Sequence, residues 1–192
     1  LFVTFFPKLV AGPIQRASEL ISQLKSKTVF DISYLTIGFK RILVGLFLKV
    51  VIADNISPFV DEGFSMNTNL LTAIDVWTLA FLFGFQIYFD FSAYSHIAIG
   101  SAQLMGIKLP ENFNFPYIAS SFKDFWKRWH ISLSSWIRDY LYLPLAGIKV
   151  SKTTGEGGIG EGLENTQKIN KTRALFITWA IMGFWHGANW TF

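Results

Sequence analysis

The feature that most constrains this chain is a series of apolar segments almost free of charged residues. Residues 174–192 (ALFITWAIMGFWHGANWTF) run for 19 residues without Asp, Glu, Lys or Arg, close to the ~20 residues that a membrane-spanning helix needs. Two further segments, residues 76–89 and 91–107, are separated only by Asp90. We expect Asp90 to mark a break, either between two short membrane segments or between one span and a re-entrant piece.

The composition agrees with a chain that is partly solvated by lipid. Charged residues make up 16% of the 192 residues, whereas soluble domains average about 25%. With 20 Phe and 7 Trp, too little polar side chain remains to cover a compact soluble surface, and the same excess excludes a disordered chain. Cys is absent, which removes disulfides, thiolate metal ligands and a Cys nucleophile. The dispersed net charge of +4 suits a lipid bilayer better than a nucleic acid, and we expect no nucleic-acid partner and no metal site.

Two apolar segments also carry charges. Residues 42–53 (ILVGLFLKVVIA) contain Lys49, and residues 131–148 contain Arg138 and Pro144. A lysine at the middle of a helix is costly in lipid, by about 3 kcal/mol, unless it snorkels or faces protein. We therefore expect the helix over residues 42–53 to pack among neighbours, and we expect Pro144 to break the second segment.

The remaining parts look extramembrane or interfacial. Residues 149–173 are rich in Gly and charge and predict a flexible loop, whose basic excess favours the cytoplasmic side. The amphipathic, aromatic residues 112–128 predict a segment that lies at the membrane interface. We expect one membrane domain over residues 1–192. Because the chain starts at Leu1 and stops within an apolar run, we also expect it to be a piece of a longer protein.

Three histidines are candidates for chemistry. His186 lies within the charge-free C-terminal segment, between Gly183 and Gly187. Burial keeps an imidazole neutral, and a neutral imidazole can accept the proton of a hydroxyl as a general base. A hydrogen-bonded structural histidine is the alternative, and the residues leave both open. His130 lies where a cationic, Trp-rich stretch gives way to an apolar one, as at a membrane interface. His96 is equally plausible from its chemistry alone.

The cations before His130 predict an anion-binding surface. Lys123, Lys127 and Arg128 lie close together in the chain and are suited to lipid headgroups or to an anionic donor such as a phosphorylated cofactor. The alternative is that they only anchor the chain at the interface.

Several strings in the chain resemble the membrane-bound O-acyltransferase family, and most of all its bacterial alginate O-acetyltransferase branch. They are residues 12–16 (GPIQR), 88–100 (YFDFSAYSHIAIG), 110–117 (PENFNFPY), 124–144 (DFWKRWHISLSSWIRDYLYLP) and 184–192 (FWHGANWTF). The resemblance runs through nearly the whole chain, in the order of the family.

This resemblance implies an all-α integral membrane protein, a multi-helix bundle with re-entrant and interfacial helices around a central tunnel. It implies transfer of an acyl group, in this branch acetyl, to hydroxyls of an exported polysaccharide such as alginate. His186 would be the membrane-embedded catalytic histidine and His130 the second family histidine, at the tunnel. The residues that we expect to contact the donor or acceptor are Lys127, Arg128, Arg138, Trp185, Asn189 and Asp90.

The resemblance also implies a setting. The protein would be a multi-pass protein of the bacterial inner membrane, working with partner proteins of polysaccharide acetylation or export. No tightly bound cofactor is expected, and the donor would be acetyl-CoA or another activated acetyl carrier. Since the chain covers well under half of a typical member, we expect it to be inactive alone. At two positions it departs from the family pattern, with Ala93 in place of Gly and His96 in place of Asp, so the role of that acidic position is in doubt here.

Three other functions remain open. Sister branches of the same family transfer D-alanine to teichoic acid or acetylate peptidoglycan. A membrane transporter or channel could use Asp90, His96, His130 and His186 as a relay, and loss of transport without acyl transfer would identify it. A structural membrane scaffold is the third alternative, and the histidines inside apolar segments argue against it.

Overall fold

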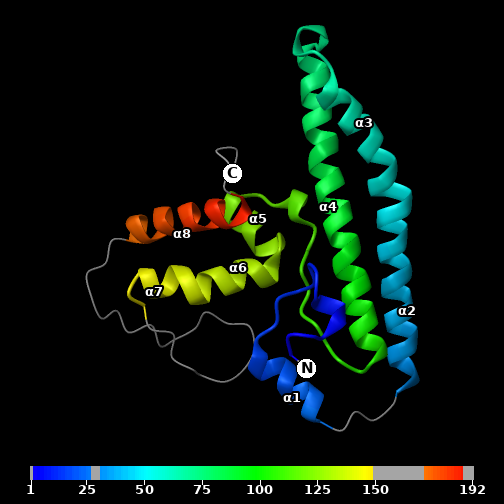
Figure 1. The fold of residues 1–192 in the computed structure, drawn as a ribbon, viewed down its shortest axis with the longest axis vertical. Coiled ribbons are helices and arrows are strands. Elements are labelled where there is room, and N and C mark those ends of the chain that lie inside the picture. Colours follow the sequence, from blue (N-terminus) through cyan, green and yellow to red (C-terminus); the bar gives the residue numbers. More distant parts are fainter. Residues whose placement is uncertain (1, 27–30, 149–170, 188–192) are drawn as a thin grey trace. The chain divides into compact units, whose positions relative to one another are not determined.

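The computed structural model describes residues 2–26, 31–148 and 171–187 (Figure 1). Every regular element in these ranges is helical, so the predicted all-α class is confirmed for them. The chain divides into two compact units, Leu1–Ser132 and Leu133–Phe192, and each is described by itself. The central tunnel and the re-entrant helices stay predictions.

The first unit contains, in chain order, η1 (Phe6–Lys8), α1 (Ala17–Lys25), α2 (Ile32–Leu46), η2 (Phe47–Ala53), α3 (Asp54–Ser65), η3 (Thr68–Leu70), α4 (Ala73–Leu104), η4 (Pro116–Ile118), α5 (Phe122–Arg128) and the first residues of α6 (Ile131–Ile137). The second unit contains the rest of α6, η5 (Arg138–Tyr142), α7 (Leu143–Leu145) and α8 (Lys171–His186). Of these, η2 and η5 are π-helical turns.

A long helical hairpin dominates the first unit. Helices α2, η2 and α3 run one way and α4 returns beside them (Figure 1). Asp31 caps α2 by accepting a hydrogen bond from the backbone N–H of Ser33. Thr72 and Asp75 form a reciprocal capping box at the start of α4, which satisfies two donors that a helix terminus otherwise leaves free. The 32 residues of α4 extend about 48 Å, more than the ~30 Å hydrocarbon core of a bilayer.

The expected break at Asp90 is wrong, because α4 continues through it. The neighbouring helix supplies the reason: the Lys49 Nζ lies 2.7 Å from a carboxylate oxygen of Asp90 and 2.8 Å from one of Asp54. Opposite charges on facing helices offset each other, so the helix keeps its backbone hydrogen bonds around the acid. The helix that carries Lys49 packs against α4 on one side, while Phe47, Val50 and Val51 remain exposed. The prediction that it packs among neighbours is therefore confirmed only for the side toward α4.

The π-helical turn η2 has its own stabilising side chain. The Asn55 amide donates to the carbonyl oxygens of Val50 and Val51, both at 3.0 Å. A π-turn widens the helix and displaces carbonyls from their usual partners, and Asn55 satisfies two of them. Such turns occur frequently at functional sites, and η2 carries Lys49.

Helices α2 and α4 approach each other through glycine. Gly38 and Gly45 on α2 are buried, as is Gly100 on α4. A Cβ at Gly100 would lie 2.7 Å from the carbonyl oxygen of Gly38, and one at Gly45 would lie 2.7 Å from that of Ala93. Small residues at such a contact let backbones come close, as is common between membrane helices.

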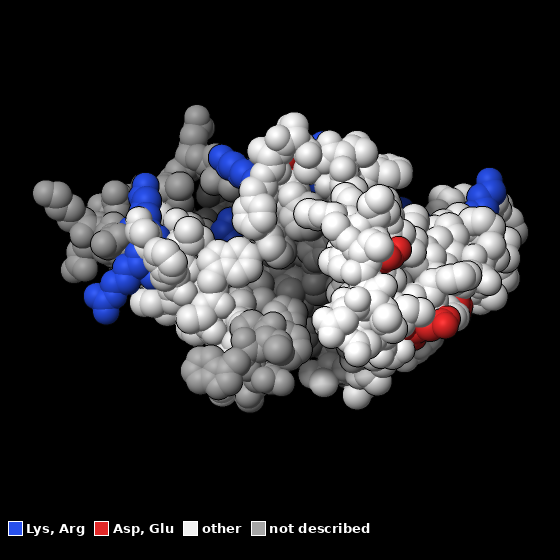
Figure 2. All heavy atoms as spheres, turned by 90° about the horizontal axis from the view of Figure 1, so that it is seen from above, with Lys and Arg blue, Asp and Glu red and all other residues white. Residues whose placement is uncertain are grey.

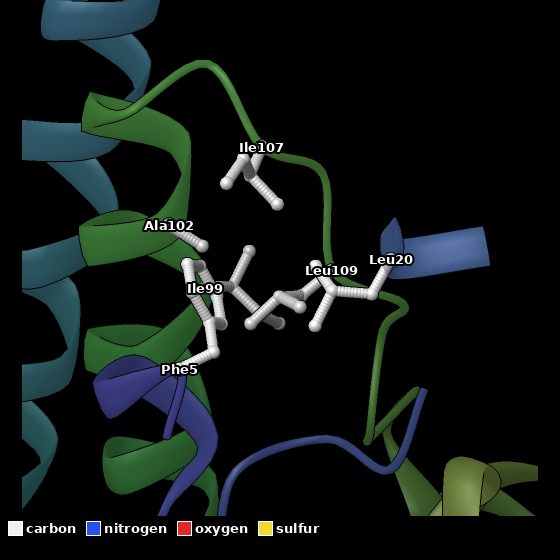
Figure 3. Close-up of a cluster of buried hydrophobic side chains, with 6 residues drawn as sticks. All are labelled: Phe5, Leu20, Ile99, Ala102, Ile107 and Leu109. Carbon is white, nitrogen blue, oxygen red and sulfur yellow. The ribbon is translucent and has the colours of Figure 1, made fainter. Parts of the chain in front are cut away.

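The buried hydrophobic core of the first unit lies at the C-terminal end of α4 (Figure 3). Its side chains come from the N-terminal segment, from α1, from α4 and from the loop that follows α4; they are Phe5, Leu20, Ile99, Ala102, Ile107 and Leu109. The loop is also held by α1, where Gln23 donates to the carbonyl of Lys108 at 3.1 Å and accepts from its backbone N–H at 2.8 Å. This core fixes the path of the chain as it leaves α4.

Much of the hairpin surface is apolar and exposed. Leu43 is 62% exposed, Trp77 67% and Phe81 64%, and Figure 2 shows a face on which charged side chains are few. Within the described residues, α4 is the one helix long and apolar enough to cross a membrane. Its most apolar window has a mean hydropathy of 1.3 and is 0% buried, unlike the core helix of a soluble protein. Faces of this kind need lipid or further protein against them.

In the second unit, α6, η5 and α7 follow one another without a gap. The helix ends after Leu145, one residue beyond Pro144 and within the predicted segment 131–148, so the expected break near Pro144 is confirmed. The π-turn η5 ends two residues before the proline and supplies a wider turn where a regular α-helix would clash with the pyrrolidine ring. Helix α8 packs against η5. It includes the first 13 residues of the predicted span 174–192; residues 188–192 and residues 149–170 of the predicted loop lie outside the described residues.

Candidate functional site

His130 lies at the junction between α5 and α6, in a backbone conformation that L-residues rarely adopt. Ser121 caps α5 by accepting from the backbone N–H of Asp124 at 3.1 Å. The helix ends after Arg128, and His130 then has φ 41°. A non-glycine residue in the left-handed region costs about 1–2 kcal/mol, so its surroundings must hold it there.

The turn at His130 pairs with the loop that follows α4. The backbone N–H of Ile131 donates to the carbonyl of Asn112, and that of Asn114 donates to the carbonyl of Arg128, both at 2.9 Å. Among the described residues, the two non-glycine positions with positive φ are His130 and Phe115 (φ 44°). His130 lies within the turn, and Phe115 directly follows Asn114 in the loop with which the turn pairs. Local backbone strain clusters at functional sites and persists where the surroundings over-determine it.

Aromatic rings surround the His130 imidazole. Its centroid lies 4.6 Å from that of Phe91, edge to face, and 6.5 Å from that of Phe113, near parallel. The ring cluster continues outward through Phe113 to Tyr88, Tyr117, Phe125 and Trp129. Tyr117 donates to the carbonyl of Gly84 at 2.6 Å, and burial raises the pKa of Tyr117. The imidazole is therefore half-buried beside an apolar wall.

A buried polar network lies beneath this turn. Asn112 is 1% exposed and its amide donates to the hydroxyl of Ser95 on α4 at 3.1 Å. Its Oδ1 accepts from the hydroxyl of Ser132 at 2.8 Å and, over a longer 3.4 Å, from the backbone N–H of Ser132. The Ser132 hydroxyl in turn accepts from the backbone N–H of Ile14 at 2.9 Å. Asn112 and Ser132 thus join four segments of the chain, since Asn112 bonds Ser95 and Ser132 bonds Ile14.

His96 belongs to a second, adjoining cluster. Its Nδ1 lies 3.4 Å from an Nη of Arg41 on α2, and Arg41 forms a bidentate ion pair with Glu111. Because Arg can only donate, this contact makes Nδ1 the acceptor nitrogen. The cluster lines a small pocket, with a volume of about 10 Å³, together with Ser92, Ser95, Ile99, Asn112 and Phe113. That is room for roughly one water molecule.

The predicted donor-binding cations have different surroundings. Arg128 is half-buried, and its Nε donates to Asp124 at 2.9 Å while an Nη donates to the carbonyl of Asn114 at 3.3 Å. Its charge is thus used within the fold. Lys123 and Lys127 are exposed and remain available to an anion. Asp90 pairs with Lys49, as described above.

The second unit holds the other predicted site residues. His186 is exposed in the last turn of α8, with its ring 5.0 Å from that of Trp185. Arg138 lies in η5 and donates to the nearly buried carboxylate of Asp139 at 2.8 Å. Asn189 lies outside the described residues. No group of three His, Asp or Glu side chains suited to a metal ion occurs within the described ranges.

Sequence reasoning missed Asn112, Arg41 and Glu111. Asn112 and Glu111 fall within the string 110–117, whose resemblance to a family was noted without a role for either residue. An Asn within an aromatic run is a possible signal, because a polar side chain in such surroundings needs buried partners. For Arg41 the sequence offers no signal, since Glu111 is 70 residues away.

Known proteins resemble this chain along its length. A family model described as MBOAT, membrane-bound O-acyltransferase family, matches residues 1–157. The whole chain is 44% identical to a peptidoglycan O-acetyltransferase of Helicobacter pylori, covering 34% of that protein. It is 40% identical to a probable alginate O-acetylase AlgI of Pseudomonas aeruginosa, covering 33% of it. Over 97% of its residues it is 33% identical to a teichoic acid D-alanyltransferase of Bacillus subtilis, covering 45%. The chain thus spans about a third of the length of the first two relatives.

Proposed function

Because this chain belongs to the membrane-bound O-acyltransferase family, we propose that the protein of which it forms part transfers an acyl group to a hydroxyl group. The acyl group is acetyl and the acceptor is an exported polysaccharide such as alginate. Relatives named as O-acetylases or O-acetyltransferases, at 40–44% identity over the whole chain, support acetyl as the group that is transferred. The two among them that are named as alginate O-acetylases support the polysaccharide acceptor. The protein works as a multi-pass protein of the bacterial inner membrane, with partner proteins of polysaccharide acetylation or export.

The proposed reaction needs a base and a way to stabilise negative charge. The acceptor hydroxyl loses its proton to a neutral imidazole, its oxygen attacks the acyl carbonyl carbon, and a tetrahedral oxyanion forms. The oxyanion collapses as the bond to the donor breaks, and the imidazolium returns the proton to the leaving group. We assign the base to His186 and place His130 beside the reacting groups. Trp185, Asn189, Arg138 and Asp90 are proposed to orient donor and acceptor.

One observation carries the proposal for this chain: His130 is held in a left-handed turn with rings on its sides and a buried network beneath. A catalytic side chain gains from a fixed orientation, because the ordering cost is met before the substrate binds.

The acyl donor is proposed to be acetyl-CoA or another activated acetyl carrier. Lys127, with the neighbouring Lys123, is exposed beside the His130 turn and suits the anionic part of such a donor. Arg128 was expected to do the same, but its pairing with Asp124 and Asn114 favours a role in holding the turn.

The test uses the full-length parent, expressed in cells that make the polysaccharide. Wild type, His186→Ala and His130→Ala are compared at equal levels of protein in the membrane. Mild base then releases the esters from the isolated polysaccharide, peptidoglycan and teichoic acid. We expect acetate from the polysaccharide to be lost with His186→Ala and strongly reduced with His130→Ala. The exposed Lys40 offers a control, since Lys40→Ala leaves both histidines in place.

The fraction that changes identifies the acceptor. Loss of acetate from peptidoglycan would replace the polysaccharide by the acceptor of the Helicobacter relative. Loss of D-alanine from teichoic acid would replace acetyl transfer by D-alanyl transfer. Ester contents unchanged in all three fractions would remove the proposed mechanism.

A further inference from the structure

We infer that Asn112 is a positioning residue for His130, because it ties the turn that carries the imidazole to α4 and to the start of α6. The inference rests on the proposed role of His130 in acyl transfer. It concerns a residue on a different segment, whose side chain acts through the backbone and the neighbours of His130.

The first step is that the Asn112 side chain has one orientation. The backbone N–H of Ser132 can only donate, so the atom that faces it must be the carbonyl oxygen Oδ1. The amide nitrogen then faces the Ser95 hydroxyl at 3.1 Å. With 1% of its surface exposed, Asn112 cannot exchange these partners for water, and each lost partner would leave a buried polar group unsatisfied.

The second step is that Asn112 is bonded to both residues that follow His130. Its backbone carbonyl accepts from the N–H of Ile131 at 2.9 Å, and its Oδ1 accepts from Ser132. On the other side of the turn, Asn114 bonds Arg128. His130 at φ 41° therefore lies between two fixed points, and Asn112 provides the one on the C-terminal side.

The third step is that Phe113, the residue after Asn112, lies beside the His130 imidazole. The Phe113 ring lies near parallel to that of His130, with centroids 6.5 Å apart, and the Phe91 ring on α4 lies edge to face at 4.6 Å. Asn112 is bonded to Ser95, one turn along α4 from Phe91. The Phe91 and Phe113 rings also contact each other, with centroids 5.2 Å apart. The bond from Asn112 to Ser95 thus ties the segment that carries Phe113 to the helix that carries Phe91.

The test follows the reactivity of individual histidines in the full-length parent, in native membranes. Diethyl pyrocarbonate modifies accessible imidazoles, and mass spectrometry of the peptides gives a rate for each histidine. In Asn112→Ala we expect His130 to react faster while His186 keeps its wild-type rate. We expect ester formation in cells to fall by about 10- to 100-fold, as for a catalytic group displaced by ~1 Å.

Two further variants separate positioning from general loss of structure. Asn112→Asp keeps oxygen acceptors for Ser132, and the Ser95 hydroxyl can rotate to donate, so we expect it to recover part of the ester content. Asn114→Ala removes an exposed amide two residues away and leaves the backbone bond to Arg128, so we expect wild-type labelling and ester content. If Asn112→Ala fails to accumulate, Ser95→Ala removes one of the three side-chain bonds and should show the same selective labelling to a smaller degree.

The outcomes decide between the explanations. Unchanged labelling at His130, or an equal increase at His130 and His186, would overturn the inference, the second because it indicates general loosening. Selective labelling of His130 in Asn112→Ala, together with full ester content in Asn112→Ala and in His130→Ala, would keep the positioning role and refute the proposed function instead.

Discussion

Adding one methyl group at Gly45 tests the close contact between α2 and α4. A Cβ there would lie 2.7 Å from the carbonyl oxygen of Ala93 and 3.1 Å from the backbone nitrogen of Ile97. Ordinary C···O contacts are about 3.3–3.6 Å, so the helices must separate by roughly 0.6–0.9 Å. The Cγ1 atom of Ile97 would also lie 2.7 Å away, and rotation of that side chain can relieve this one contact. The other two atoms belong to the backbone of α4, so side-chain rotation alone does not make room for the methyl group.

The expected cost follows from two opposing contributions. Overpacking costs about 1–3 kcal/mol, whereas replacing Gly by Ala within a helix gains about 0.8–1.0 kcal/mol. Because the clash is with backbone, we expect Gly45→Ala to destabilise by about 1–2 kcal/mol. Gly84 on α4 is the matched control, since its Cβ would meet only the Tyr117 hydroxyl, at 3.5 Å. We expect Gly84→Ala to stabilise by about 0.5–1 kcal/mol.

The assay is unfolding of the full-length parent in detergent, with the free energy of unfolding compared among wild type and both variants. The two substitutions add the same group to helical glycines, so the difference of about 1.5–3 kcal/mol between them isolates the helix contact. If Gly45→Ala were as stable as Gly84→Ala, the close approach of α2 and α4 would be refuted.

Three further predictions use the same protein. Lys49→Met should lower the unfolding temperature, and adding Asp90→Asn should restore part of the loss. The coupling free energy between the two substitutions should be about 1 kcal/mol, and a value near zero would show that Lys49 and Asp90 do not form an ion pair. His130→Gly should have a free energy of unfolding about 1 kcal/mol higher than that of His130→Ala, and so a higher unfolding temperature, since glycine adopts φ 41° without strain. Equal stability of the two variants would contradict the left-handed turn. The pKa of Asp31 lies below its ordinary value because the Ser33 backbone N–H donates to it, so its stabilisation of α2 is full above about pH 4 and is lost as pH falls through the lowered pKa. Asp31→Asn should abolish that part of the acid dependence, as measured by unfolding at pH 2–5, and an unaltered acid dependence would show that the cap is not ionic.

Much of the local structure could be predicted from the sequence. The apolar runs around residues 42–53 and 76–107 predicted helices; the end of α2 and η2 cover the first run, and α4 covers most of the second. Asp90 and Pro144 were expected to interrupt helices, because an acid in lipid and a proline inside a helix are both costly when considered alone. The helix does end one residue after Pro144. At Asp90 the cost is removed by Lys49 on the facing helix, which is not apparent from the nearby sequence.

The candidate site was predicted only in part. The histidines were identified because an ionisable ring in an apolar segment stands out by its chemistry. The left-handed conformation of His130 was not, because nothing in its neighbours requires φ above zero. Asn112 escaped notice for the same reason, since its partners lie 17 and 20 residues away.

The sequence by itself determined the helical class, the lipid-facing character and the family, because composition, apolar run length and motif strings are properties of neighbouring residues. Only the tertiary structure decided which charges neutralise each other, that α4 is unbroken, and how the His130 turn is held. Those properties depend on contacts between residues as far apart as Ile14 and Ser132, separated by 118 positions. A hydrogen bond of that range exists only after the chain has folded, so no local pattern could have revealed it.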